Sequence, residues 1–379
     1  MYNIREYAAM IHDARRVEAY QRALQLSVTP DSVVVDIGTG LGIFALLACQ
    51  AGARKVYAIE PSEVIAVARQ LAAINGYLER IEFIEDLSTR VTLPEPADVI
   101  VSDLGGAIPL FQQHLPTIMD ARKRLLKPHG TLIPKCDTLW AGVVSAPAAH
   151  ARIAPSTDRA LGLDMRLAWN LAANLSSTVR FTEGQLMAAP QRLAVLNYSE
   201  LDDPNLHTQV KWDAIRPGSG HGIGVWFERT VAEGISYSTA PGEPEMVYSP
   251  LFLPWAEAVE LVEGDTVLLE IRADLRSDDY ILSWNTRISN ATGVKCLFRQ
   301  SEFFGEARSP ARLRKQSAAH VPQLSDDGAI EGAILHHMDG RNTIADIARE
   351  VQQQFPTRFP TLELAIGHVG DLSRKYSKG

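Results

Sequence analysis

The sequence predicts an α/β domain built on a parallel sheet, then a mainly antiparallel β domain, then a small α+β domain at the C-terminus. Short apolar strands alternate with helical segments up to about Pro147. Beyond it, strand-like segments are separated by turn signals, and near Ser309 the composition shifts again. A chain of 379 residues exceeds what a single hydrophobic core usually serves, so several domains are expected.

The first part of the chain switches repeatedly between helical and strand patterns. Apolar residues at helical spacing predict one helix within residues 4–26, and Thr29-Pro30-Asp31 follows it as a turn. Further helices are predicted at 43–51, 62–75 and 110–126, and strands at 33–35, 55–59, 81–84, 98–102 and 131–133. Strands that alternate with helices form parallel sheets. We therefore expect an N-terminal helix in residues 1–27 and a Rossmann-like domain in residues 28–148.

The remaining chain is predicted to form two more domains. Apolar runs at 224–227, 266–271 and 281–284 indicate strands, and residues 160–176 have a helical pattern. This predicts an antiparallel β domain over residues 149–310 with a helical insertion at about 160–180. In residues 311–379, helices are expected at 328–338, at 343–355 and from Leu362 onward.

Composition limits the classes of function. Hydrophobic residues make up 46% and charged residues 22%, which is typical of a globular protein, and the formal net charge is −8. An acidic chain has no general attraction for phosphate backbones, so nucleic acid is not an expected partner. The three cysteines form no CxxC pair, so no metal site is expected. Since neither a signal peptide nor a membrane span is visible, a cytoplasmic location is expected.

The strongest chemical signal is Asp36-x-Gly38-x-Gly40-x-Gly42, placed after a strand and before a helix. Glycines permit a tight turn and close approach of the backbone to a ligand. Glu60 ends the next strand, where an acidic side chain can accept hydrogen bonds from both hydroxyls of a ribose. This arrangement indicates a nucleoside bound at the carboxyl edge of a parallel sheet.

Two nucleoside ligands compete for this motif. Dinucleotide sites use GxGxxG, which brings a helix N-terminus to a pyrophosphate. Here the spacing is GxGxG and Asp36 precedes it, so a pyrophosphate would be repelled. Asp36 can instead accept a hydrogen bond from the amino group of a methionine moiety. The motif therefore favours S-adenosylmethionine over NAD.

The same residues resemble those of the protein arginine methyltransferases. The resemblance is carried by Val35–Gly42, Ala51–Glu60 and the Leu126-x-Pro128-x-Gly130 turn, and it covers about residues 5–290. It implies that the N-terminal helix closes the cofactor site, that Arg16 contacts the cofactor carboxylate, and that the second domain is a β-barrel. Leu161-Gly162-Leu163-Asp164 is similar to the start of the family's dimerisation arm, which implies a homodimer.

From the motif and the resemblance together we expect two sets of ligand-binding residues. The cofactor-binding set is Arg16, Asp36, Gly38, Thr39, Gly40, Gly42, Glu60, Pro61, Asp86, Leu87 and Ser102. The substrate-contacting set is Tyr7, Tyr20 and Tyr248.

The acceptor loop departs from the family pattern. The family carries two glutamates, nine residues apart, that clamp the substrate guanidinium; Asp103 and Gln112 stand at those positions here. Two carboxylates hold a guanidinium by charge-assisted bonds, and an aspartate with an amide lacks much of that strength. Asp103 and Gln112 are the candidate catalytic residues. Asp103 either orients or deprotonates an acceptor, or it is a helix N-cap. His114, which follows on the next helix, is the most plausible base among the lone histidines, although a polar surface histidine is the favoured interpretation.

The C-terminal segment resembles the PqqD-like domains. The resemblance rests on Leu324–Ile330, Met338–Ala348 and Phe355-Pro356. It implies a winged-helix-like module that captures the leader segment of a ribosomally made peptide at a sheet edge. The alternatives are a helical cap on the barrel and a nucleic-acid-binding winged helix.

Three hypotheses about function follow. The first is an S-adenosylmethionine-dependent methyltransferase that modifies a side chain or terminus of a peptide, as in the tailoring of peptide natural products. The second is a small-molecule methyltransferase with a structural C-terminal domain; an arginine methyltransferase with an altered acceptor loop is a further variant. The third is a nucleoside- or peptide-binding protein without catalysis.

Overall fold

The structure is a computed structural model that describes residues 3–153, 159–160, 162–307 and 309–378. The chain divides into two compact units, Met1–Glu306 and Ala307–Gly379. The expected boundary between Pro310 and Ala311 therefore falls slightly inside the second unit. No helix in the described part of the chain is both long and apolar enough to cross a lipid bilayer.

The single helix expected near the N-terminus is in fact two helices, α1 (Ile4–His12) and α2 (Ala14–Ser27). Asp13 separates them with backbone angles φ −71° and ψ 81°, outside the helical region. The Asp13 carboxylate accepts hydrogen bonds from the N–H of Arg16 and, at 2.8 Å, from the N–H of Val247. A contact distant in sequence thus fixes the break, which explains why helical periodicity did not reveal it.

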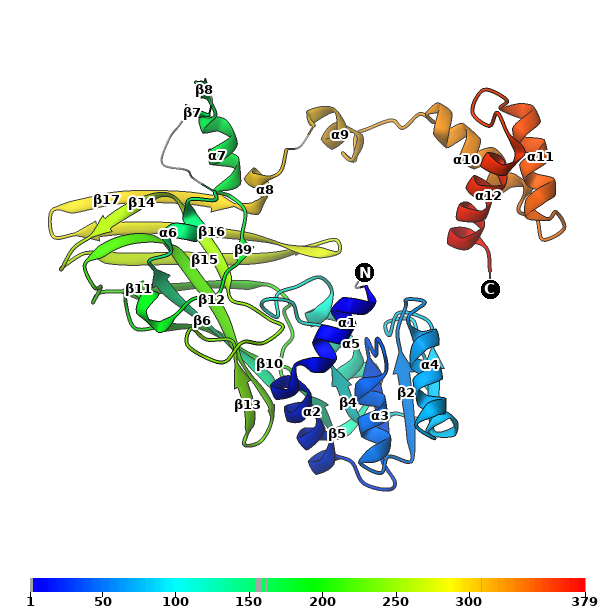
Figure 1. The fold of residues 1–379 in the computed structure, drawn as a ribbon, viewed down its shortest axis with the longest axis horizontal. Coiled ribbons are helices and arrows are strands. Elements are labelled where there is room, and N and C mark those ends of the chain that lie inside the picture. Colours follow the sequence, from blue (N-terminus) through cyan, green and yellow to red (C-terminus); the bar gives the residue numbers. More distant parts are fainter. Residues whose placement is uncertain (1–2, 154–158, 161, 308, 379) are drawn as a thin grey trace. The chain divides into compact units, whose positions relative to one another are not determined.

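A five-stranded parallel sheet forms the centre of the α/β domain, as predicted (Figure 1). Its strands in chain order are β1 (Val33–Ile37), β2 (Lys55–Ile59), β3 (Ile81–Ile84), β4 (Ala97–Ser102) and β5 (Leu126–Ile133). Its helical segments are α3 (Ile43–Gln50), α4 (Ile65–Ile74), the 3₁₀ turn η1 (Leu78–Arg80) and α5 (His114–Arg124). In the spatial order β3-β2-β1-β4-β5, the chain builds the sheet outward from β1 to β3 on one side and then continues with β4 and β5 on the other side of β1. Ligands bind at this switch point, between β1 and β4, in such sheets.

The second domain consists of two antiparallel sheets, in agreement with the predicted barrel-like β domain. The first contains β6 (Cys136–Val144), β9 (Ser177–Thr178), β10 (Gln191–Asn197), β12 (Gly218–Ala232), β13 (Ile235–Ser238) and β14 (Leu251–Leu261). The second contains β11 (Leu206–Trp212), β15 (Thr266–Arg276), β16 (Asp279–Asn290) and β17 (Gly293–Ser301). Short helical segments accompany them: α6 (Pro147–His150), η2 (Glu183–Gln185) and α8 (Glu302–Gly305).

The helical insertion is shorter than the sequence predicted. A small hairpin of β7 (Arg159–Ala160) and β8 (Leu163–Asp164) precedes α7 (Arg166–Ala172). Leu161, part of the arm-like motif, lies outside the described residues. Gly162 has φ +81°, which a helix does not tolerate, so the helix begins only after it.

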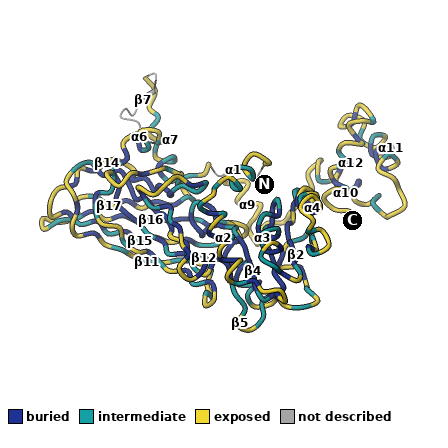
Figure 2. Tube along the Cα trace, turned by 60° about the horizontal axis from the view of Figure 1, so that its bottom comes forward, coloured by how far each residue is buried: buried dark blue, intermediate teal, exposed yellow. Residues whose placement is uncertain are grey.

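One hydrophobic core joins the α/β domain to the β domain. Apolar residues of the parallel sheet, such as Val34 and Ile100, belong to the same buried cluster as Trp255 and Trp284 of the β sheets. Figure 2 shows the buried residues concentrated along the strands. Because the core is continuous, the cofactor motif and the acceptor loop are held in one rigid frame.

The second unit has a core of its own. Its described residues form α9 (Pro310–Lys315), α10 (Asp326–His337), α11 (Ile344–Gln354) and α12 (Leu362–Tyr376). Ile334, Val351 and Val369 are completely buried between the last three helices. The expected helices at 328–338, at 343–355 and from Leu362 therefore all exist.

The expectation of an α+β, winged-helix-like unit is corrected by this structure. Residue 307 and residues 309–378 contain helices but no assigned strand. The segment between α9 and α10 includes Pro322 and lacks the alternating apolar pattern of a strand, which accounts for the absence of a wing there.

Candidate functional site

The glycine motif forms a tight loop from the end of β1 to α3. Gly38, Gly40 and Gly42 have φ of +71°, +52° and +83°, a region that other residues rarely occupy. A Cβ atom at Gly40 would lie 2.6 Å from the ring of Tyr7 on α1, and one at Gly38 would meet Leu104. Glycine is thus required both by the backbone and by the side chains that pack on the loop.

Glu60 follows β2 and lies at the same edge of the sheet. Its carboxylate accepts hydrogen bonds from the N–H of Gly40 at 3.1 Å and from the hydroxyl of Ser62 at 2.6 Å. It is 8% exposed and borders the cavity described below. The Ser62 N–H also donates to it at 3.1 Å, so these bonds fix the carboxylate and leave one acceptor site, on Oε2, for a ribose.

Asp36 lies near the end of β1, just before the glycine loop. The side chain is fully buried behind the loop and accepts bonds from the Thr39 hydroxyl and the Ala45 N–H. Burial raises its pKa to about 7, against the opposing effect of these hydrogen bonds. Asp36 thus braces the loop from inside through one carboxylate oxygen, and its Oδ1 has no hydrogen-bond partner among the described residues. The expected contact with an amino group of the cofactor stays a prediction.

A cavity of about 560 Å³ lies at this edge of the sheet. It is within the size range of small-ligand sites. From the cofactor-binding set, the residues that line it are Gly38, Glu60, Pro61, Asp86 and Leu87. From the catalytic and substrate sets, those that line it are Tyr7, Asp103, Gln112 and Tyr248. The cavity therefore brings the cofactor motif and the acceptor loop together.

The other expected site residues lie behind the cavity wall. They are Arg16, Tyr20, Asp36, Thr39, Gly40, Gly42 and Ser102. The Tyr20 hydroxyl, expected to contact substrate, instead donates to the Ser102 carbonyl, and its ring stacks on Phe44 with centroids 4.4 Å apart. Tyr20 thus holds the end of β4 through its hydroxyl and packs on α3 through its ring.

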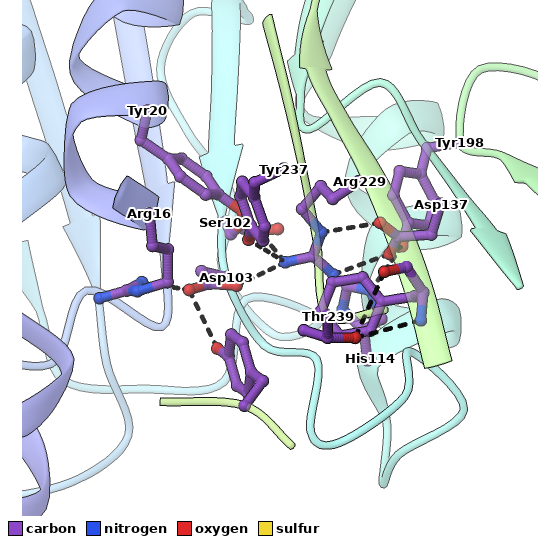
Figure 3. Close-up of polar contacts among 12 residues, drawn as sticks. Arg16, Tyr20, Ser102, Asp103, His114, Asp137, Tyr198, Arg229, Tyr237 and Thr239 are labelled. Atoms are coloured by element: carbon purple, nitrogen blue, oxygen red, sulfur yellow. Dashed lines mark hydrogen bonds and ion pairs between the residues drawn. The ribbon is translucent and has the colours of Figure 1, made fainter. Parts of the chain in front are cut away.

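Asp103 is the centre of a buried network of charges (Figure 3). It is 5% exposed and forms ion pairs with Arg16 and, at 2.6 Å, with Arg229 of β12. The Tyr248 hydroxyl donates to the same carboxylate at 3.1 Å. Although burial opposes ionisation of Asp103, the two guanidiniums outweigh it and hold its pKa below the usual value. A carboxylate held in this way is a poor proton acceptor.

This network bears on two expectations. Asp103 caps no helix, since the residue before α5 is Gln113. Arg16, expected at the cofactor carboxylate, has one guanidinium nitrogen on Asp103 and another on the Met10 carbonyl at 2.6 Å. Its Nε is buried without a partner among the described residues, and the expected contact with the cofactor carboxylate stays a prediction.

Arg229 also binds a second carboxylate. Its Nε and Nη2 donate to Asp137 of β6 at 2.8 and 2.7 Å, a bidentate pair, and both side chains are essentially inaccessible to solvent. Two guanidiniums and two carboxylates therefore share this buried region, and their formal charges cancel. The acceptor end of the cavity has no net negative charge from this network to offer a cationic substrate.

Gln112 stands at the position of the second glutamate in the family pattern, and its place is determined by its backbone contacts. It has φ +44°, unusual for a residue other than glycine, and its N–H donates at 2.8 Å to Asp279, the first residue of β16. Gln113 donates to the carbonyl of Ser277 in the turn before β16. The acceptor loop is thus tied to the β domain, and Gln112 is an exposed amide at the cavity rim.

His114 is not the surface residue that the sequence suggested. It is 2% exposed, lines the cavity and contacts the Tyr198 hydroxyl at 3.0 Å through Nε2. Burial lowers its pKa to about 4, so the ring is neutral at physiological pH.

Sequence reasoning missed Arg229, Asp137 and Tyr198 entirely. A signal for Arg229 was present: it shares a strand face with Val225, Phe227 and Val231, all buried. A charge on an apolar strand face needs a buried partner.

The residues present fit S-adenosylmethionine. Gly38 of the glycine loop lines the cavity, Glu60 is an acceptor for a ribose, and the acids Asp86 and Glu60 suit a cationic ligand.

Comparison with known proteins agrees with this geometry. Residues 18–134 match the family model of ribosomal protein L11 methyltransferase (PrmA). A probable protein arginine N-methyltransferase 6 from Arabidopsis thaliana is 28% identical over 58% of this chain, which spans about half (52%) of that relative. Protein arginine N-methyltransferase 6 from Xenopus tropicalis is 29% identical, covering 70% of this chain and 81% of the relative. Arginine N(omega)-methyltransferase from Streptomyces achromogenes subsp. streptozoticus is 28% identical, covering 70% and 75%.

Among solved structures, the Trypanosoma brucei PRMT1 enzyme-prozyme heterotetrameric complex with AdoHcy is similar with a TM-score of 0.72 and 20% identity. The match covers 78% of this chain and 96% of that one, and it supports the fold of the first unit. The fold, the cofactor site and these relatives define the class: the protein is an S-adenosylmethionine-dependent methyltransferase. Within that class it is similar to the protein arginine methyltransferases.

Proposed function

We propose that the protein transfers a methyl group from S-adenosylmethionine to an uncharged nitrogen or oxygen of a peptide or protein, rather than to an arginine guanidinium. The relatives named as protein arginine N-methyltransferases support a polypeptide substrate. The observation that carries the choice of acceptor is Asp103, whose carboxylate is already neutralised by Arg16 and Arg229.

A guanidinium bound beside Asp103 would have to compete with two internal ones. Arg229 is additionally anchored by Asp137, so it cannot leave Asp103 without breaking a buried ion pair. Gln112 provides an amide in place of a second carboxylate. A desolvated cation without an anionic partner is strongly disfavoured, whereas an uncharged acceptor has no such requirement.

The chemistry requires little more than correct placement. The cofactor supplies an electrophilic methyl group, and the protein must align the acceptor with it and exclude water. The shared cavity supports this role, because Glu60 and Gly38 of the cofactor motif and Asp103 and Gln112 of the acceptor loop all line it.

The test is a label-transfer assay with radiolabelled S-adenosylmethionine and the full chain. The acceptors are peptides that differ at a single central residue: arginine, lysine, histidine, asparagine or serine. We expect label in one or more of the last three peptides. Label in the arginine peptide alone would overturn the proposal.

A matched variant sharpens the assay. Combining Gln112→Glu with Arg229→Met restores the second carboxylate and removes the ion pair between Arg229 and Asp103. This double variant should gain label transfer to the arginine peptide. The single variant Gln112→Glu should gain less, since Arg229 still occupies Asp103.

A small-molecule acceptor is the second candidate. It is favoured by the Streptomyces relative, whose name specifies arginine and no protein. The same assay with the corresponding N-acetyl amino acid amides distinguishes the two candidates. Equal kcat/KM for a peptide and for its single-residue amide would favour the small molecule.

We further propose that the second unit holds the peptide during this reaction, as in the tailoring of ribosomally made peptides. Support comes from its independent core and from the apolar side chains that α12 exposes, Leu364 (56%) and Ile366 (37%). Capture at a sheet edge is not part of this proposal, because the described residues of this unit contain no strand. Helix-in-groove or helix-face binding is the mode that its architecture offers.

The corresponding test compares the full chain with a chain that ends at Glu306. We expect KM for a long peptide to rise while the affinity for S-adenosylhomocysteine stays the same. An unchanged KM would show that the second unit does not hold the substrate.

A further inference from the structure

His114 has one nitrogen that the protein leaves without a partner. It is the first residue of α5, it lines the cavity together with Asp103 and Gln112, and only 2% of it is exposed. Nε2 is 3.0 Å from the Tyr198 hydroxyl. Nδ1 is buried and has no hydrogen-bond partner among the described residues. A buried polar atom without a partner is costly, and at a cavity wall it indicates a ligand.

The hydrogen bonds behind His114 determine which nitrogen carries the proton. The Tyr198 hydroxyl donates its one proton to Asp137, since a carboxylate held by Arg229 can only accept. The Tyr198 oxygen must therefore accept from Nε2–H of His114. The imidazole is neutral, because burial disfavours its charged form and the N-terminus of α5 repels a positive charge. It follows that Nδ1 is the unprotonated nitrogen, a hydrogen-bond acceptor.

We propose that His114 Nδ1 accepts a hydrogen bond from the N–H or O–H of the group to be methylated, and that this bond selects an uncharged acceptor. The chain Asp137–Tyr198–His114 fixes the tautomer, and Gln112 offers an amide at the same cavity. An amide, an imidazole or a hydroxyl satisfies Nδ1. A guanidinium could donate to Nδ1 as well, but Asp103, the carboxylate of the acceptor loop, is already paired with Arg16 and Arg229.

The transfer balances with this arrangement. The lone pair of the acceptor atom takes the methyl carbon, whose former bonding electrons stay on the departing thioether sulfur. The proton of the acceptor N–H or O–H leaves to water, and His114 stays neutral and holds the acceptor through Nδ1, because burial disfavours its imidazolium form. This inference rests on the proposed methyl transfer to an uncharged group, and it adds the residue that holds that group.

The first test is spectroscopic and needs no substrate. In protein labelled with ¹⁵N-histidine, long-range ¹H–¹⁵N correlation should show His114 with Nε2 protonated and Nδ1 bare. The signal is assigned by its loss in His114→Asn. In Tyr198→Phe, which removes the acceptor of Nε2–H, the fixed tautomer should become mixed. A bare Nε2 in the unchanged protein would overturn the proposal.

The second test measures binding of two matched probes in the presence of S-adenosylhomocysteine. N-acetylcitrulline amide and N-acetylarginine amide have nearly the same shape, but only the second is charged. We expect the citrulline probe to bind about tenfold tighter or more, the ratio that roughly 1.4 kcal/mol produces. Its binding should shift the Nδ1 resonance of His114.

Two variants separate a specific hydrogen bond from a structural effect. His114→Asn places an amide oxygen near the position of Nδ1 and should retain most of the preference for citrulline. His114→Phe fills the same space without an acceptor and should abolish it. Equal loss in both variants, with affinity for S-adenosylhomocysteine intact, would refute the role of His114. Absence of S-adenosylhomocysteine binding in the unchanged protein would instead refute the proposed function itself.

Discussion

The carboxylate of Glu60 has the most direct role of any single side chain in the cofactor site. It is held by the Gly40 N–H and by Ser62, and it borders the cavity. We expect Glu60→Ala to weaken binding of S-adenosylhomocysteine by about 1–3 kcal/mol, the range for lost hydrogen bonds to a charged group. Isothermal titration calorimetry measures this change. Glu63→Ala, on the exposed turn before α4, is the matched control, and unchanged affinity in Glu60→Ala would exclude the ribose contact.

Asp36 connects the cofactor loop to the pH dependence of stability. Burial raises its pKa in the folded protein to about 7, whereas the unfolded chain titrates near 3.9. Between these values the unfolded chain has lost a proton that the folded protein keeps. The contribution of Asp36 to stability is therefore complete below the lower pKa and is lost as the pH rises through about 7.

Asp36→Asn removes this titration while retaining an oxygen that can accept from Thr39 and Ala45. The free energy of unfolding of the variant, relative to the unchanged protein, should rise steadily with pH across this window. Urea unfolding at several pH values measures it. A difference that does not vary with pH would contradict the raised pKa.

At the scale of elements, the Asp137–Arg229 pair joins β6 to β12 and reaches the loop after β4. Arg229→Met leaves Asp137 buried without its counter-ion and should lower the free energy of unfolding by about 3–5 kcal/mol. Replacing both residues, with Asp137→Leu added, leaves no unpaired charge at that position. The double variant should therefore be more stable than Arg229→Met alone in chemical denaturation. Strict additivity of the two single changes would contradict this coupling.

Some structural features of these elements follow from nearby residues in the sequence, and others depend on distant ones. The glycine loop was predictable, because positive φ at Gly38, Gly40 and Gly42 is a property of those residues themselves. So was α11, which begins at the capping box of Thr343 and Asp346. The break at Asp13 and the burial of His114 depend on partners far away in the chain, Val247 and Tyr198. The acceptor site was therefore less predictable than the cofactor site.

At the scale of the whole molecule, we propose that two copies associate through the α7 segment. Leu163 and Leu167 are 65% and 75% exposed there, which is costly for a monomer. Light scattering should give twice the chain mass of 41.6 kDa. Leu167→Glu should shift the mass to that of a single chain, while Leu26→Glu, an exposed leucine on α2, should leave it unchanged. A single-chain mass for the unchanged protein would exclude the dimer.

The position of α1 suits it to open and close over the cofactor cavity, which Tyr7 and Met10 of this helix line. The ring of Tyr7 packs on the backbone of Gly40, and none of the nine residues of α1, all of them described, is fully buried. A helix anchored so lightly opens at a small free-energy cost, so it can admit and release the nucleoside without unfolding the domain. We propose that the residence time of the demethylated product depends on how often this helix lifts.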